Sequence, residues 1–172
     1  VYKRQSENIE PVFFEKAREL GIWMGQNKKT LVYGGANIGL MECIAKVAKD
    51  NGSMIIGVIP TKLEERGRTS DLVDVTFRTD NLSDRKDVML NESDVAVALP
   101  GGVGTLDEIF HVMAAATLDY HQKKVIFYNI NGFWNGILDF LNGLEEKRFA
   151  HHPLNSYFAV ANNLRELIEL LK

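Results

Sequence analysis

Short apolar runs that stop at glycine or proline alternate with segments of helical periodicity along most of this chain. The runs predict strands at residues 30–33, 54–59, 73–77, 94–99 and 125–128, with 1–2 as the end of an earlier strand. Helices are predicted at residues 11–24, 40–49, 105–118, 132–146 and 162–171, and a further helix begins at Ser83. Nearly continuous apolar strands are typical of parallel sheets covered on both faces. The alternation therefore predicts an α/β fold, an open parallel sheet with helices on both faces, as a single domain over residues 1–172.

Two local features refine this outline. Gly52 follows the helix at 40–49, and glycine is favoured there because many helices end in a left-handed backbone conformation. The polar stretch 61–71 is the longest predicted loop, and loops of that length are often functional.

The composition argues against several classes of protein. Twenty Lys and Arg residues against 23 Asp and Glu give a net charge of −3, without the basic surplus expected of a nucleic-acid-binding domain. The single cysteine, Cys43, excludes an internal disulfide and a multi-cysteine metal site. No apolar run approaches the length of a membrane span, and the start, VYKR, is not typical of a signal peptide. We therefore expect a cytoplasmic protein that binds neither nucleic acid nor membrane, with further residues upstream because the chain does not begin with Met.

Two glycine turns occupy the same place in the pattern, after a buried strand and before a helix. The first glycine turn, residues 34–39, reads GGANIG, and the second glycine turn, residues 101–105, reads GGVGT. Ligands of open α/β sheets bind at the carboxyl ends of the strands, where helix N-termini attract phosphate. Glycine also lets the backbone approach a ligand closely. Two such turns favour a phosphate site, and the alternative is that both need glycine for turn geometry alone.

Neither turn matches the commonest nucleotide-binding motifs. Leu40 stands where a Walker motif has lysine, and Asp107 stands where a dinucleotide fingerprint has its third glycine. A mononucleotide is therefore favoured over a cofactor with two phosphates.

Glu108 and Arg85 each allow two interpretations. Residues 105–108, TLDE, match a capping box in which Glu108 bonds back to the N-cap amide, and capping is favoured on that pattern alone. In the alternative, Glu108 faces the sugar of a bound nucleotide. Arg85 is either a solvated charge or a phosphate contact. Glu108 and His111 share a helix face, but an iron site with that spacing needs a second copy, so no metal is expected.

Several motifs together resemble one family. Residues 100–108, PGGVGTLDE, resemble the PGGxGTxxE signature of the Lonely Guy (LOG) family, cytokinin riboside 5′-monophosphate phosphoribohydrolases long labelled as possible lysine decarboxylases. Residues 33–41, YGGANIGLM, are similar to the first glycine motif of that family, and GVIP at 57–60 and DRK at 84–86 fall in family order and spacing. The resemblance extends over essentially the whole chain.

The resemblance implies a Rossmann-like, doubly wound fold, a homodimer, and hydrolysis of the N-glycosidic bond of AMP or an N6-modified AMP without metal or cofactor. The products would be the free base and ribose 5-phosphate. The family's catalytic pair falls on Arg85 and Glu108. The resemblance implies substrate contacts by Ser6, Gly35, Arg85, Lys86, Gly101, Gly102, Val103, Gly104, Thr105, Leu106 and Asp107.

The chain departs from the family pattern at several positions. KRQ at residues 3–5 replaces Cys-Gly-Ser, Glu42 stands where glycine is common, Ala114 and Ala115 replace a Thr-Trp pair, and Lys124 replaces a proline. These changes affect the base end of the expected pocket more than the phosphate end. The small residues 114–116 would allow close approach either of the helix's own sheet or of a partner helix.

Two other functions are alternatives on this sequence. One is a non-catalytic nucleotide-binding or carrier protein of the same fold. The other is decarboxylation, which normally requires pyridoxal phosphate bound to a lysine, and Lys86 is the lysine nearest the expected site.

Overall fold

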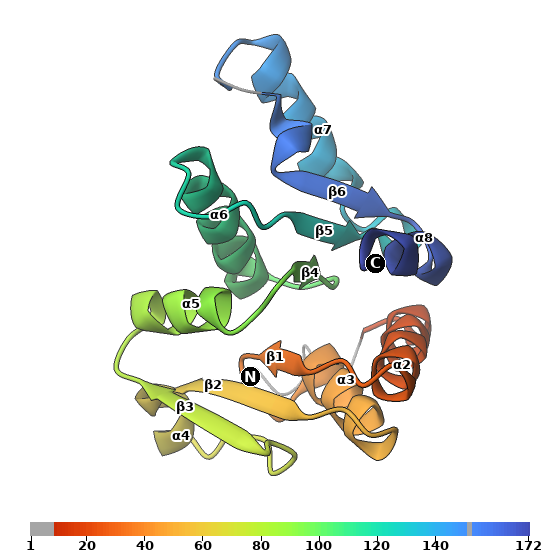
Figure 1. Cartoon of the computed structure of the whole chain (residues 1–172), viewed down its shortest axis with the longest axis vertical. Helices are drawn as coiled ribbons and strands as arrows, with labels where there is room; N and C mark the ends of the chain where they lie inside the picture. Colours follow the sequence, from red (N-terminus) through yellow and green to blue (C-terminus); the bar gives the residue numbers. More distant parts are fainter. Residues whose placement is uncertain (1–8, 151–152) are drawn as a thin grey trace. The chain divides into compact units, whose positions relative to one another are not determined.

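The computed structural model describes residues 9–150 and 153–172 (Figure 1). The chain divides into two compact units, Val1–Ser93 and Asp94–Lys172. Each unit contains three parallel strands and the helices that connect them, so the predicted α/β class with parallel strands is confirmed. That the two units form a single domain stays a prediction, and the strand predicted at residues 1–2 lies outside the described residues. No helix within the described ranges is both long and apolar enough to cross a bilayer.

In the unit Val1–Ser93, a central strand pairs with one strand on each side. The strand order is β1 (Leu31–Tyr33), β2 (Ile55–Pro60) and β3 (Val75–Thr79). The helices are α2 (Pro11–Gln26), α3 (Gly39–Asp50), α4 (Thr61–Glu65) and α5 (Leu82–Asn91). Tyr33 and Ile55 on the strands pack with Ala45 and Ala48 of α3 to form a buried cluster. The apolar strands and the small face of α3 therefore build the core of this unit.

Helix α2 packs against α3 along a line of small residues four apart in sequence. Ala17, Gly21 and Gly25 are all buried, and this spacing places them on one face of the helix. A Cβ added at Gly25 would overlap the Asn51 side chain and lie 2.6 Å from the Asn51 carbonyl carbon and oxygen. The close approach of the two helices therefore depends on the absence of a side chain at position 25.

Helices α3 and α4 end in the same way, on a glycine in the left-handed region. Gly52 has a φ of +102° and Gly67 a φ of +61°. At the end of α4, the Gly67 N–H donates to the backbone carbonyl of Glu64, and the Arg68 N–H donates to that of Leu63. These bonds satisfy the last carbonyls of the helix. The prediction of Gly52 as a helix end is confirmed. The prediction of a loop over residues 61–71 is wrong for 61–65, which form α4. Gly67, just after this helix, was the sequence signal for a helix end.

Strand β3 begins at Val75, two residues later than predicted, because Asp74 is held in a turn beside β2. The Asp74 carboxylate accepts from Lys49 Nζ at 2.8 Å and from the Ile55 N–H at 2.9 Å. The Asp74 N–H donates to the Ile55 carbonyl at 2.8 Å. The bond from Lys49, followed by that from Ile55, lowers the pKa of the Asp74 carboxyl.

The unit Asp94–Lys172 is built around a wholly buried strand. The strand order is β4 (Ala96–Ala98), β5 (Val125–Tyr128) and β6 (Phe158–Ala161). The remaining elements are α6 (Val103–Thr117), η1 (Ile130–Gly132), α7 (Asn135–Glu146), η2 (Leu154–Ser156) and α8 (Leu164–Leu170). The Phe127 ring of β5 makes edge contacts with Trp134 and Phe158, each at 5.5 Å between centroids. Strand β6 was not predicted from the sequence.

Asn129 connects the carboxyl end of β5 to the segments around it. Its side-chain amide donates to Asn135 at 2.9 Å and to Asn162 at 3.2 Å, and its oxygen accepts from the Trp134 N–H at 2.8 Å. The Trp134 indole N–H donates to the Ala98 carbonyl at 3.1 Å. These bonds fix the start of α7 against the ends of β4, β5 and β6.

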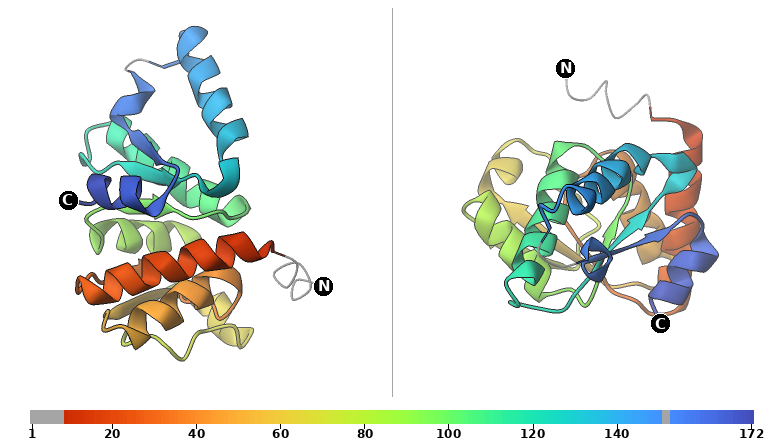
Figure 2. Two further views of the ribbon diagram at one scale, coloured as in Figure 1. Left: turned by 90° about the vertical axis from the view of Figure 1, so that its right-hand side faces the viewer. Right: turned by 90° about the horizontal axis from the view of Figure 1, so that it is seen from above.

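Helix α7 is less buried than α6, the other long helix of its unit. It begins at Asn135, three residues later than predicted, because Asn131 and Gly132 have positive φ values of 52° and 71°. The helix extends away from the strands of its unit (Figure 2), and Leu141 is its only buried residue within the described part of the chain. Phe140 is 57% exposed.

We expect Gly25→Ala to lower the free energy of unfolding by about 1–3 kcal/mol, the usual cost of overpacking, because backbone atoms of Asn51 occupy the space. The matched control is Gly143→Ala in α7, where an added Cβ meets no described atom within 4 Å. This control should raise stability by up to about 1 kcal/mol, since glycine is a poor helix former. Urea denaturation of both variants measures the difference, and equal stabilities would contradict the packing argument.

Candidate functional site

Helix α6 begins inside the second glycine turn. Gly102 is the N-cap, Val103 is the first helical residue, and the Leu106 N–H donates to the Gly102 carbonyl at 3.1 Å. The capping-box prediction is therefore wrong, because Thr105 is already the third residue of the helix. Glu108 lies in the second turn, too far along α6 to bond back to its N-cap. The backbone of Gly102, rather than the side chain of Thr105, defines the start.

Only one glycine of the second glycine turn is required by neighbouring protein atoms. A Cβ at Gly101 would overlap the Thr105 hydroxyl. No described atom lies within 4 Å of a Cβ at Gly102 or Gly104, and neither residue has a positive φ. The first N–H groups of a helix have no partner within it and attract anions. Glycine at 102 and 104 therefore suits the close approach of a ligand to the start of α6.

The first glycine turn is different, because the protein's own atoms account for its leading glycines. Gly35 has a φ of +69°, and a Cβ there would lie 2.5 Å from Ile59 Cγ1. A Cβ at Gly34 would overlap the Arg85 guanidinium. The interpretation that glycine serves turn geometry is thus supported for Gly35, whereas Gly34 is required by Arg85. A substrate contact by Gly35 stays a prediction.

Residues 68–70 pair with the first glycine turn, which the sequence did not predict. The Ser70 N–H donates to the Gly35 carbonyl at 2.8 Å, and the Asn37 N–H donates to the Arg68 carbonyl at 3.0 Å. Ser70 is buried in consequence. Burial raises the pKa of the nearby Tyr33 phenol, and the Ser70 hydroxyl opposes that shift. The predicted long loop therefore includes a segment that braces the turn.

Helix α5 carries Arg85 and Lys86 close to its start. The Asn81 side chain caps the helix by accepting from the N–H groups of Ser83 at 2.8 Å and Asp84 at 3.0 Å. Arg85 and Lys86 are half-buried. The Arg85 Nε–H donates to the Val58 carbonyl at 3.2 Å. Arg85 is therefore held against the sheet, and its interpretation as a solvated surface charge is wrong.

The predicted site residues are divided between the two units. Gly35, Arg85 and Lys86 belong to Val1–Ser93, while residues 101–108 belong to Asp94–Lys172. Ser6 lies outside the described residues. Action of Arg85 and Glu108 on one substrate stays a prediction. Among the described residues, His, Cys, Asp and Glu do not gather in groups of three or more that could hold a metal ion.

The family model and the relatives found by sequence agree on one family. The family model described as "possible lysine decarboxylase" matches residues 41–171. A probable cytokinin riboside 5′-monophosphate phosphoribohydrolase of Oryza sativa subsp. japonica is 33% identical over 172 residues, covering 100% of this chain and 70% of the relative. A cytokinin riboside 5′-monophosphate phosphoribohydrolase of Arabidopsis thaliana is 31% identical, covering 100% and 79%. The molybdenum cofactor carrier protein of Chlamydomonas reinhardtii has a similar structure, with a TM-score of 0.71 at 25% identity over 94% of this chain and 87% of that protein.

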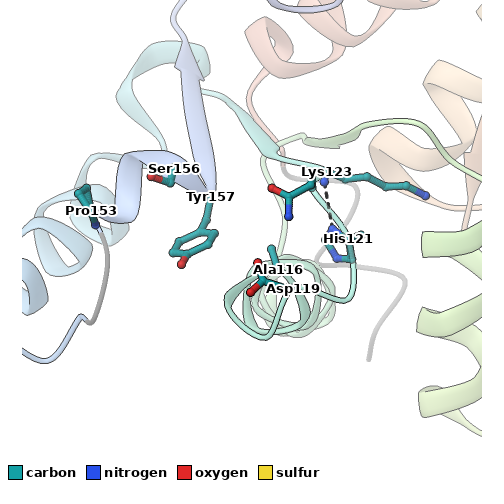
Figure 3. Close-up of a pocket in the computed structure, with 8 residues that line it drawn as sticks. Ala116, Asp119, His121, Lys123, Pro153, Ser156 and Tyr157 are labelled. Carbon is teal, nitrogen blue, oxygen red and sulfur yellow. Dashed lines mark hydrogen bonds between the residues drawn. The ribbon is translucent and has the colours of Figure 1, made fainter.

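A cavity of about 310 Å³ lies away from the second glycine turn, within the same unit (Figure 3). Its lining comes from the end of α6 and from the segments that precede β5 and β6, namely Ala116, Asp119, His121, Gln122, Lys123, Pro153, Ser156 and Tyr157. The cavity therefore lies at the amino ends of β5 and β6, whereas the glycine turn follows the carboxyl end of β4. His121 Nδ1 accepts from the Lys123 N–H at 3.0 Å, so the proton of the neutral ring is on Nε2.

We expect His121 to titrate below the ordinary value of 6.5, because burial and then the charge of Lys123 lower its pKa. The folded state favours the neutral ring, so its contribution to stability is complete above pH 6.5 and is lost as the pH falls through that value toward the folded pKa. Imidazole ¹⁵N NMR spectra recorded against pH measure the midpoint and the tautomer. A midpoint above 6.5, or a proton on Nδ1 in the neutral ring, would contradict this account.

Proposed function

The chain belongs to the family described as possible lysine decarboxylases, and on that premise we propose that it is a nucleoside 5′-monophosphate phosphoribohydrolase. It would cleave the N-glycosidic bond of AMP, or of an N6-modified AMP of the cytokinin type, to free base and ribose 5-phosphate. Relatives over the whole chain bear the name cytokinin riboside 5′-monophosphate phosphoribohydrolase. The structural observation that carries the proposal is the open second glycine turn at the start of α6, whose second turn carries Glu108.

The second glycine turn would bind the 5′-phosphate. Gly102 and Gly104 leave space above the backbone at the N-terminus of a 15-residue helix. Unpaired N–H groups and the positive end of the helix dipole act together on an anion at that place. Arg85 and Lys86 would supply the positive charge that completes the phosphate site. Binding energy from the phosphate would then position the sugar for the reaction.

Glu108 would act on the ribose. Cleavage of the bond between C1′ and the base builds positive charge on the sugar, and the transition state resembles an oxocarbenium ion. A carboxylate beside C1′ stabilises that charge and accepts a proton from the attacking water. The water oxygen bonds to C1′, and the electron pair of the broken bond leaves with the base. The base takes up one proton from solvent, and Glu108 returns the proton of the attacking water to solvent, so that the reaction balances. Arg85 would hold the phosphate and orient the sugar throughout.

The second candidate is a nucleotide-binding carrier without catalytic activity. The similarity to the molybdenum cofactor carrier protein of Chlamydomonas reinhardtii favours this alternative. A carrier would bind its ligand tightly and release it unchanged. The two functions differ in one measurement, because only the hydrolase releases free base from a bound nucleotide.

We expect 5′-monophosphates to be hydrolysed and nucleosides to be inert, because the glycine turn contributes nothing to a ligand without phosphate. The purified protein is incubated with AMP, an N6-modified AMP, adenosine, GMP and CMP, and the free base is measured by chromatography. Equal turnover of adenosine and AMP would sink the phosphate-site assignment. Binding of AMP without release of base would favour the carrier.

We expect Glu108→Gln to reduce turnover by roughly 10²–10⁴, the usual contribution of a positioned acid or base. Glutamine has nearly the same size and no charge, so the affinity for AMP and the melting temperature should change little. Glu15→Gln on the exposed face of α2 is the matched control and should leave turnover unchanged. Turnover of Glu108→Gln near that of the wild type would remove Glu108 from the mechanism.

We further propose that the protein is a homodimer that uses the exposed face of α6. Phe110, Ala114 and Leu118 are four residues apart and exposed, and Leu118 is 70% exposed. Analytical ultracentrifugation should give twice the 19.4 kDa of one chain at micromolar concentration. Phe110→Glu should shift the population toward monomer, while Met54→Glu, at an exposed position of the other unit, should not. A wild-type protein found only at 19.4 kDa would refute the dimer.

A further inference from the structure

The first glycine turn and Arg85 fit closely together within the unit Val1–Ser93. Gly34 directly follows β1, and the Arg85 Nε–H donates at 3.2 Å to the carbonyl of Val58 in the neighbouring strand β2. A Cβ at Gly34 would overlap Arg85 Nη2 and lie 3.1 Å from Cζ. The guanidinium therefore lies over the backbone of Gly34, just after the carboxyl end of β1 and beside Val58 of β2.

Arg85 is the neighbour that requires glycine at position 34. The three heavy atoms nearest to an added Cβ are Nη2, Cζ and Nε of Arg85. The φ of Gly34 lies outside the left-handed region, so its backbone conformation is open to other residues. Gly35, the next residue, differs in both respects, because it has a φ of +69° and would contact Ile59.

We propose that Gly34 is a positioning residue for Arg85, so that the start of the first glycine turn holds the arginine rather than the ligand phosphate. This inference rests on the proposed function, in which Arg85 binds the phosphate. The Val58 carbonyl fixes Nε, and the bare backbone of Gly34 gives Nη2 its place. Together they define the plane of the guanidinium. A guanidinium group fixed in this way is preorganised to bind an anion, whereas a mobile guanidinium group would lose conformational freedom on binding.

The overlap involves the outer end of a long side chain, which gives Gly34→Ala a distinctive expected effect. Arg85 can swing aside to admit the methyl group, so the fold should survive. The guanidinium would then leave its position, and a displacement of about 1 Å at a reacting group can reduce the rate by about 10²-fold. Gly34→Ala should therefore reproduce the loss of activity of Arg85→Ala.

A double-mutant cycle tests the inference with wild type, Gly34→Ala, Arg85→Ala and the double variant. The measurements are kcat and KM for release of base from AMP, and the melting temperature. Gly34→Ala alone should lower kcat/KM at least tenfold, and it should change kcat/KM less than twofold when Arg85 is already alanine. Additive effects of the two substitutions would overturn the inference. So would an inactive Arg85→Ala beside a fully active Gly34→Ala. Wild-type activity in Arg85→Ala would instead refute the role of Arg85 in the proposed function.

A second measurement does not depend on activity. In wild type, the Arg85 Nε–H should exchange slowly with solvent in ¹⁵N NMR spectra, because it is bonded to the Val58 carbonyl. Gly34→Ala should accelerate that exchange, and the control Gly143→Ala should not. If Gly34→Ala lowers the melting temperature, the double variant should be no less stable than Arg85→Ala alone, because removal of the guanidinium removes the overlap. Unchanged exchange in Gly34→Ala would overturn the inference. So would a loss of stability on Gly34→Ala that is equally large in the wild type and in Arg85→Ala.

Discussion

Backbone carbonyls at the carboxyl ends of parallel strands need hydrogen-bond partners where strand pairing stops, and in this protein side chains supply several of them. The Val58 carbonyl, directly after the last residue of β2 that pairs with β1, accepts from Arg85, and the Ala98 carbonyl at the end of β4 accepts from Trp134. After β5, the Asn129 amide bonds to the Asn135 side chain and to the Trp134 backbone N–H, and so connects the end of that strand to the start of α7. A buried polar group without a partner destabilises the fold by about 1–3 kcal/mol, so these bonds are part of the architecture. In the unit Val1–Ser93, the same requirement places a candidate catalytic residue against the sheet.

Much of the fold could be predicted because long apolar periodicities survive tertiary packing. The strand at 125–128 and the helix from Pro11 have the predicted positions within two residues. Strand β6 was missed because it is only four residues long and contains two alanines, which have little intrinsic preference for strands. It exists because β5 offers it a partner. Tertiary pairing, which a local pattern does not record, decides such short elements.

The candidate site shows the same division between local and non-local information. Motifs indicated candidate glycines and acids, and a capping-box pattern at 105–108 gave Glu108 the wrong structural role. The helix starts earlier because the chain turns at Gly102 after β4. Likewise, the half-burial of Arg85 and its place over Gly34 depend on β1 and β2 lying side by side. Contacts between residues so far apart in sequence produce no local pattern, so one amino-acid sequence does not reveal them.

Some glycines of this chain are required by neighbouring protein atoms and others are not, and substitutions at the two kinds would have different effects in living cells. Gly25 and Gly35 are required by neighbouring protein atoms, whereas no described atom stands near a Cβ at Gly102 or Gly104. Cellular quality control responds to the fraction of unfolded protein. Variants at 25 or 35 would therefore be depleted by degradation, while variants at 102 or 104 would accumulate at normal abundance with an altered binding surface. Measurements of protein abundance alone would therefore not detect variants at 102 or 104. Detecting them would require measuring the cell's substrate and product levels.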